Sequence, residues 1–270
     1  MILKRRRSTI IWIVLAVSLC TIYMFAYSTI GALWEDLENN VSKDRILLSY
    51  EDDIFFLLNK SADDPELVKY VKSHFVVPPS DKVYNLTQGD QIDFSRGQSK
   101  LLDSYFNKKE NGVFLDVGSY DGEFHSVSLF FEKSRKWKGV LVENNPVVFR
   151  RLQWKNRKAH TINGCARVNR TVGQTTPYAN NKCFWVETIL LASGYSQVDL
   201  LNIDTHDNEI NVLRSIPLEK FKVKAISLEL DRLRARNHDV VAYLKNRGYK
   251  YIHQFEDHLY KKIDQIYIKL

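Results

Sequence analysis

The sequence has few cysteines, three in 270 residues, and none of them forms the Cys-x-x-Cys spacing of a zinc site. Cys20 lies within an apolar run, which leaves Cys165 and Cys183 as a pair in the rest of the chain. In an oxidising compartment such a pair forms a disulfide. We therefore predict a Cys165–Cys183 disulfide; the alternative is two free, buried thiols. No metal site is predicted.

The chain also lacks extended basic patches. Its net charge is +7, but only residues 4–7 form a tight basic cluster, and elsewhere basic and acidic side chains alternate. A nucleic-acid-binding surface normally needs basic residues gathered on one face. We therefore expect no nucleic-acid partner, and we interpret most of the charge as solvated surface.

Charged residues are absent from residue 8 to residue 34, and residues 10–27 are almost continuously apolar. A helix of about 20 apolar residues spans a bilayer. The basic cluster precedes this run and acidic residues follow it, which predicts a cytosolic tail and a luminal or extracellular body. The competing interpretation is a cleavable signal peptide, whose apolar region is normally only about 7 to 15 residues long.

Sequons for N-glycosylation agree with a body in the secretory pathway. Each alone is a weak signal, because the tripeptide is common by chance. The pattern predicts a single-pass membrane protein of the endoplasmic reticulum, Golgi, endosome or plasma membrane, with the membrane itself as one partner. The candidate glycosylation sites are Asn40, Asn59, Asn85 and Asn169.

Composition along the chain predicts four parts. They are a tail (1–7), a membrane anchor (8–34), a polar stem (35–94) and one folded domain (95–270). Within the stem, Asp64 followed by Pro65 and Glu66 is a favourable helix start, because proline is tolerated at the first helical position. We expect that helix to cover residues 65–74 and to end before the extended Pro78–Pro79 segment.

The full dinucleotide-binding fingerprint is absent. Instead, the apolar run 113–117 leads into a turn with the spacing Asp-x-Gly-x-x-x-Gly, from Asp116 to Gly122. A strand, a glycine turn and a helix build the nucleotide pocket of an open α/β sheet. This spacing suits S-adenosylmethionine; the alternative is a structural turn without a ligand.

Strand and helix patterns alternate after the turn. We expect strands at 138–143, 159–163, 198–203 and 225–229, helices between them, and a terminal hairpin from 250–255 and 265–270. This order predicts a Rossmann-like α/β fold with a mostly parallel sheet and an antiparallel finish. Glu143 and Asp204 end two of these strands, on the edge where Asp116 lies. Glu143 is placed to accept hydrogen bonds from ribose hydroxyls.

These residues resemble the FkbM-type methyltransferase domain. The resemblance rests on residues 112–123, 137–146 and 155–159, and it extends to Gly97-Gln98-Ser99 upstream and to Cys165, Cys183 and residues 198–213 downstream. With the predicted anchor, the pattern is similar to the Star-like subgroup. The resemblance implies a seven-stranded S-adenosylmethionine-methyltransferase fold. It also implies a membrane protein that serves export and endosomal traffic of membrane cargo.

The sequence departs from the family at residues 204–209, where His206 and Asp207 replace the usual glutamate and glycine. His206 with Asp204 is the candidate catalytic pair, since imidazole titrates near neutral pH; the alternative is an exposed loop histidine. The altered loop leaves open that S-adenosylmethionine binding has been lost. The candidate cofactor-binding residues are Gln98, Asp116, Gly118, Ser119, Asp121, Gly122, Glu143 and Asp204.

Two functions are therefore expected. The first is a luminal module that aids transport of membrane-protein cargo between endoplasmic reticulum, Golgi and endosomes. The alternative is an active O-methyltransferase acting on a glycan, a lipid or a small molecule, because methyl transfer requires little beyond alignment and the removal of one proton. A glycosyltransferase is disfavoured, because the nearest Asp-x-Asp-like pair, Asp36 and Glu38, lies in the stem.

Overall fold

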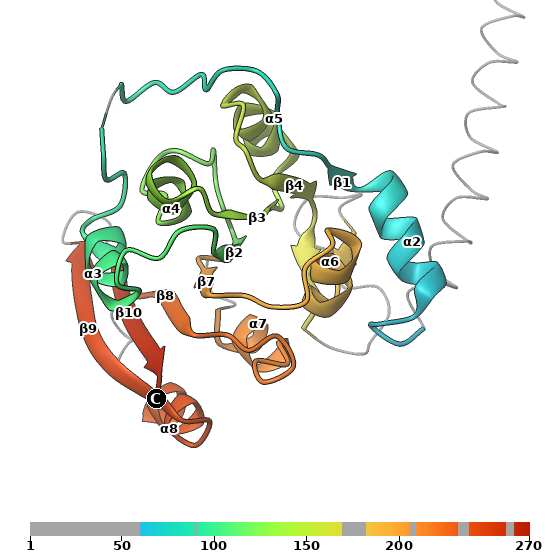
Figure 1. Ribbon diagram of the computed structural model, residues 1–270. Coiled ribbons are helices and arrows are strands. Elements are labelled where there is room, and N and C mark those ends of the chain that lie inside the picture. Colours follow the sequence, from blue (N-terminus) through green and yellow to red (C-terminus); the bar gives the residue numbers. More distant parts are fainter. Residues whose placement is uncertain (1–59, 90, 169–181, 206–208, 232–237, 258–261) are drawn as a thin grey trace, which may run out of the picture. The chain divides into compact units, whose positions relative to one another are not determined.

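The computed structural model describes residues 60–270 except 90, 169–181, 206–208, 232–237 and 258–261 (Figure 1). Among these residues, no helix is both long and apolar enough to span a bilayer. The predicted anchor at residues 8–34 lies outside them, as do the candidate glycosylation sites Asn40, Asn59 and Asn169. Asn85 is described, and its side chain is exposed.

An α/β sheet forms the centre of the fold. Its parallel part runs in the spatial order β4 (His160–Asn163), β3 (Lys138–Glu143), β2 (Val113–Val117), β7 (Leu200–Ile203), β8 (Ala225–Asp231). The order reverses between β2 and β7, because the chain first builds outward to β4 and then returns to the other side of β2. Such a switch point is where open α/β sheets bind ligands.

The sheet is mixed, and the expectation of seven mostly parallel strands is wrong. It has eight strands, and three of its ladders are antiparallel. The additional strand is β1 (Val76–Val77), which pairs antiparallel with β4. At the other end β10 (Lys262–Lys269) lies antiparallel between β8 and β9 (Tyr249–Asp257), which confirms the terminal hairpin. A two-residue strand carries no periodic signal, so the sequence did not indicate β1.

Helices cover both faces of the sheet, as Figure 1 shows. One face carries α3 (Gln98–Tyr105), α4 (Ser128–Arg135) and α5 (Pro146–Trp154). The other carries α6 (Val186–Ala192) and α7 (Glu209–Ser215), and α8 (His238–Lys245) contacts β9. Two further strands, β5 (Cys165–Ala166) and β6 (Cys183–Phe184), form a separate small sheet.

The core under α3 and α4 is aromatic. Phe106, Phe131 and Trp137 meet with ring centroids 4.5 to 5.9 Å apart, and all three are buried against Phe114 of β2. Burial of large aromatic side chains is among the strongest contributions to a core. This cluster packs at the amino end of β2. Polar residues lie at the carboxyl ends of the strands instead.

Residues 60–94, which we expected to belong to the stem, pack on the body. Helix α2 (Pro65–His74) begins as predicted, since Asp64 Oδ1 accepts hydrogen bonds from the backbone N–H of Glu66 (2.9 Å) and Leu67 (3.2 Å). The helix packs against α6, and β1 joins the sheet. The compact unit accordingly covers residues 57–270 and begins before our expected boundary at residue 95.

Candidate functional site

The glycine turn lies at the switch point. Gly118 follows β2 with φ +86°, and its N–H donates to Val142 O of the neighbouring strand (2.9 Å). A Cβ at this position would lie 1.7 Å from Asp204 O, which shows how closely the chain leaving β7 approaches. Only glycine combines this φ with this contact. The turn therefore has a structural reason for its first glycine, besides any ligand.

The second half of the turn is closed by a side chain. Asp121 Oδ1 accepts hydrogen bonds from the N–H of Glu123 (3.0 Å) and Phe124 (2.8 Å). Gly122 has φ +75°, and a Cβ there would lie 2.3 Å from Leu152 Cδ1 of α5. Asp121, which we expected to contact the cofactor, is thus occupied in shaping the loop.

Glu143 ends β3 directly beside this turn. Its Oε2 accepts from Tyr120 N (2.9 Å) and its Oε1 from Asn145 N (2.6 Å). Burial raises the pKa of this carboxyl, and the backbone N–H donors oppose that rise. Each carboxylate oxygen has two lone pairs, so both oxygens can still accept a hydroxyl donor. Glu143 is therefore held against the turn and remains chemically competent to bind a ribose.

Two buried polar side-chain atoms, one in the turn and one in α3, have no hydrogen-bond partner among the described residues. They are Ser119 Oγ and, at the first turn of α3, Gln98 Oε1. Gln98 is only 1% exposed. Buried polar atoms are rarely left unpaired unless a water or ligand completes them. Together with Glu143 and the glycine turn, they fit a polar cofactor such as S-adenosylmethionine.

Asp116 is engaged inside the protein. Its Oδ2 accepts from Ser128 Oγ (2.7 Å) and its Oδ1 from Asn202 Nδ2 (2.9 Å). Burial raises the pKa of Asp116, while these hydrogen bonds and the charge of Arg157 lower it. The Asp116 side chain thus links β2, β7 and α4. Its role at the pocket is structural, because it holds these three elements together.

A second acid in the turn, Glu123, is fully buried and is paired with Lys155. Its oxygens also accept from Thr87 N (2.9 Å), Thr87 Oγ1 (2.8 Å) and Gln88 N (2.6 Å). Burial alone would raise the pKa of Glu123, but the ammonium group and the N–H donors outweigh it and hold the pKa at about 2. Glu123 ties residues 87 and 88 to the turn. No local pattern indicates this role, because the partners of Glu123 lie more than 30 residues away along the chain.

Three acids form a row across the carboxyl ends of β7 and β8 and the amino end of β10, which runs antiparallel to β8. Asp204 follows β7, and Glu229 on β8 lies directly opposite Asp264 on β10. Burial raises the pKa of Asp204 well above its ordinary value, and the charge of Glu229 and a hydrogen bond to it raise it further. Asp204 therefore binds a proton more readily than an ordinary aspartate does, and the cause is its burial beside Glu229.

Arg96 joins the other two acids of this row. Its Nη2 donates to Glu229 Oε2 (2.9 Å) and to Asp264 Oδ2 (2.7 Å). Like charges on directly opposed strand positions are destabilising, and a guanidinium shared between them removes that cost. Sequence reasoning missed Arg96, Glu229 and Asp264, because each stands in a different element and no local motif joins them. His206, the other candidate catalytic residue, lies outside the described residues.

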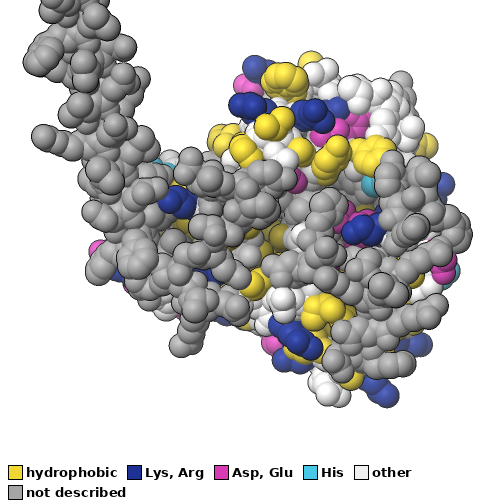
Figure 2. Space-filling model, turned by 180° about the vertical axis from the view of Figure 1, so that it is seen from behind, with side chains coloured by type: hydrophobic (Ala, Val, Ile, Leu, Met, Phe, Trp, Pro, Cys, Tyr) yellow, Lys and Arg dark blue, Asp and Glu magenta, His cyan; other side chains and the backbone are white. Residues whose placement is uncertain are grey.

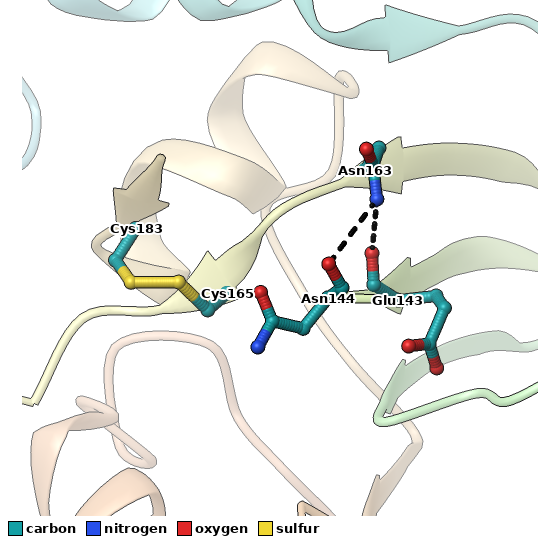
Figure 3. Close-up of a disulfide and its surroundings, with 5 residues drawn as sticks. All are labelled: Glu143, Asn144, Asn163, Cys165 and Cys183. Carbon is teal, nitrogen blue, oxygen red and sulfur yellow. Dashed lines mark hydrogen bonds between the residues drawn. A yellow bond between two sulfur atoms is a disulfide. The ribbon is translucent and has the colours of Figure 1, made fainter. Parts of the chain in front are cut away.

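The disulfide between Cys165 and Cys183 is present and joins β5 to β6 (Figure 3). It lies close to the end of β3. Asn163 Nδ2 donates to Glu143 O (2.9 Å), which fixes the chain between the disulfide and the acid. In Figure 3 the Glu143 carboxylate points away from the sulfurs, whereas the Asn144 side chain points toward Cys165. The disulfide thus braces the backbone behind the candidate site.

Removing this disulfide is expected to destabilise the body. Cys165→Ser opens a loop with a sequence separation of 18 residues, and closing a loop of about that size stabilises a protein by about 3 kcal/mol. The free energy of unfolding in urea measures the change. Cys20→Ser is the matched control, because Cys20 lies outside the compact unit. Equal stability of Cys165→Ser and the control would refute the prediction.

Comparison with known proteins gives one family match. Residues 186–251, less than half of the chain, match the Methyltransferase FkbM domain. The matched segment runs from α6 into β9 and includes Asp204 and Glu229. No curated protein matches the sequence.

Several solved methyltransferase structures are similar to this chain, all at low identity. A precorrin-6Y C5,15-methyltransferase from Geobacter metallireducens GS-15 is 13% identical, with TM-score 0.44, covering 71% of this chain and 96% of that one. The METTL16 methyltransferase domain is 11% identical, with TM-score 0.45, covering 63% and 65%. A tRNA (m1A22) methyltransferase described as putative, Sp1610 from Streptococcus pneumoniae, was solved in complex with S-adenosyl-L-methionine; it is 14% identical, with TM-score 0.40, covering 65% and 73%.

The family match and the strand order point the same way. Five parallel strands with a switch point between β2 and β7 are followed by an antiparallel terminal hairpin, and the matched segment includes β7, β8 and the start of β9. The chain has a Rossmann-like α/β fold, within which residues 186–251 match the Methyltransferase FkbM domain.

Proposed function

We propose that the body of this protein binds S-adenosylmethionine at the carboxyl ends of β2 and β3. The observation that carries the proposal is the Glu143 carboxylate, held by Tyr120 N (2.9 Å) against the glycine turn. An acid in this position accepts hydrogen bonds from ribose hydroxyls. The unpartnered Ser119 Oγ and Gln98 Oε1 supply further polar contacts for the cofactor.

For the wider role we favour transport of membrane cargo in the secretory pathway by a type II membrane protein with a luminal body. The Star-like resemblance, the apolar run at residues 8–34 and the sequons support this proposal. The disulfide agrees with it, because disulfides persist in oxidising compartments. In this role, cofactor binding would stabilise the luminal body that binds cargo, and no methyl transfer would be required.

The alternative is methyl transfer to a hydroxyl. In that reaction S-adenosylmethionine supplies the methyl group, and this chain aligns the acceptor and receives its proton. The candidate catalytic pair lies in residues 204–209, where the sequence departs from the family and where donor and acceptor would meet. We favour the transport role for this reason.

Calorimetric titration of the purified full-length protein with S-adenosylmethionine and S-adenosylhomocysteine tests the cofactor site. We expect binding that Glu143→Gln weakens at least about tenfold, since charge-assisted hydrogen bonds are worth about 1.5 to 3 kcal/mol. Glu110→Gln, at an exposed acid paired with Lys136, is the matched control. No heat of binding at about 1 mM ligand would sink the cofactor proposal.

Glycosylation tests the luminal topology. Asn85 is exposed in the described body, and its backbone N–H donates to Lys155 O (3.1 Å), so the side chain is free to carry a glycan without disturbing that contact. In secretory cells we expect endoglycosidase to reduce the mass of the full-length protein, and Asn85→Gln to remove one glycan. An unmodified protein would contradict a luminal body.

A further inference from the structure

Our expectation that basic and acidic residues are interspersed throughout the chain beyond residues 4–7 fails for one long stretch. From residue 144 to residue 186 there is no acidic residue, while there are eight basic ones. The whole chain has a net charge of +7, so this stretch alone accounts for the excess. Helix α5 and strands β4, β5 and β6 belong to it, and the charge therefore has a defined place in the fold.

The three basic residues that come directly after α5 are neutralised or used inside the body. Lys155 is paired with Glu123, Arg157 is paired with Glu132 (3.1 Å), and Lys158 Nζ donates to Ser80 O (2.9 Å). These contacts hold the carboxyl end of α5 and the loop that contains Ser80 in place.

Arg150 and Arg151 differ from these residues. Both are exposed, and neither forms an ion pair with any residue that the structure describes. They are the two uncompensated charges of α5.

Large apolar side chains stand beside these two arginines. Val147, Arg150, Arg151 and Trp154 follow the spacing i, i+3, i+4 and i+7, which places them in one stripe on the outer face of α5. Val147 is 50% exposed and Trp154 is 69% exposed. Leu152, on the opposite side of the helix, is buried against the sheet, so the stripe faces solvent.

The loop before α3 extends this stripe. Asn156 Nδ2, two residues beyond Trp154, donates to Val83 O (2.9 Å), and Val83 is 87% exposed. Lys82 and Asp81 in the same loop are both exposed and cancel each other in charge. At the top of Figure 2, the end at which Figure 1 draws α5, lysine and arginine side chains lie among hydrophobic ones.

We propose that this α5 face, defined by Val83, Val147, Arg150, Arg151 and Trp154, docks on a membrane surface that contains anionic lipid. Tryptophan and aliphatic side chains insert at the level of the headgroups, and arginines bind the phosphates beside them. The face has uncompensated positive charge, which matches an anionic surface. An exposed tryptophan among aliphatic side chains favours a lipid interface over a purely polar partner. The docking does not depend on cofactor binding. It does require anionic lipid in the leaflet that faces the body; for a luminal body this is the luminal leaflet, whereas anionic lipid is concentrated in the cytoplasmic one.

Fluorescence quenching by brominated lipids tests the proposal on the full-length protein reconstituted in vesicles. We expect more quenching of Trp154 in a mixture of brominated phosphatidylcholine and phosphatidylserine than in brominated phosphatidylcholine alone. Subtracting the Trp154→Phe signal isolates this residue from the other four tryptophans. The increment should fall with added salt, because the screening length is only about 3 Å at 1 M.

Charge reversal supplies the matched comparison. Arg150→Glu with Arg151→Glu should remove the increment due to anionic lipid, whereas Lys245→Glu with Lys250→Glu, the same charge change at exposed residues of α8 and β9, should keep it. Equal quenching in both lipids, or equal loss in both double variants, would overturn the proposal. So would an increase of total quenching in the anionic mixture that persists unchanged in Trp154→Phe, because that increase would come from the other tryptophans.

Discussion

Gly118→Ala is expected to destabilise the body by about 3 kcal/mol or more. The φ of +86° costs an L-residue roughly 1 to 2 kcal/mol, and forcing an extra methyl group into a packed site adds roughly 1 to 3 kcal/mol. The methyl group would lie 1.7 Å from Asp204 O, a backbone atom that cannot rotate away. Relief requires β2 and β7 to separate at the switch point, so the same change should also abolish S-adenosylmethionine binding.

Gly194→Ala is the control for this experiment. Gly194 has φ +82°, close to that of Gly118, but a Cβ there has no heavy atom within 4 Å among the described residues. It therefore carries the backbone strain without the collision, and we expect a loss of only about 1 to 2 kcal/mol. Urea denaturation measures both variants. Equal losses would mean that the approach of Asp204 to the turn is not as close as the structure has it.

Glu123→Ala is expected to cost about 3 kcal/mol at neutral pH, because it leaves the buried ammonium of Lys155 with only its longer contact to Asp121 Oδ2 (3.7 Å). The Thr87 and Gln88 N–H groups lose their acceptor as well, so residues 87 and 88 should detach and become sensitive to protease. Glu110→Ala breaks the exposed pair with Lys136 and should change stability by no more than about 1 kcal/mol.

The same carboxylate gives the protein an acid-dependent stability. The pKa of Glu123 in the folded protein is about 2, below the ordinary value of 4.5. A lowered folded-state pKa means that the unfolded chain binds the proton more readily. The stability that Glu123 contributes is thus complete above about pH 4.5 and is lost as the pH falls toward 2. In Glu123→Gln, the free energy of unfolding should depend less steeply on pH between about 4.5 and 2. An unchanged pH dependence would show that other acids dominate acid unfolding.

Local patterns predicted the elements whose signals are local. Helix α2 begins and ends where the Asp64 cap, Pro65 and the later prolines indicate, and β2 and β3 coincide with their apolar runs. The glycine turn was also recognised from its spacing. The mixed, eight-stranded sheet was not, because β1 is too short to show a period. The close approach of Gly118 and Asp204 could not be predicted either, since their backbones meet only after β2 and β7 pair.

The sequence alone determined which acids stand at the ends of strands and which cysteines pair, since both follow from short-range pattern and elimination. Only the tertiary structure decided what those acids do. Asp116 accepts hydrogen bonds from Asn202 and Ser128, Glu143 accepts one from the turn, and Asp204 is buried beside Glu229, which raises its pKa. The physical reason is that the charge state and hydrogen bonding of a buried carboxyl depend on groups brought to it by distant elements, and no local sequence pattern carries that information.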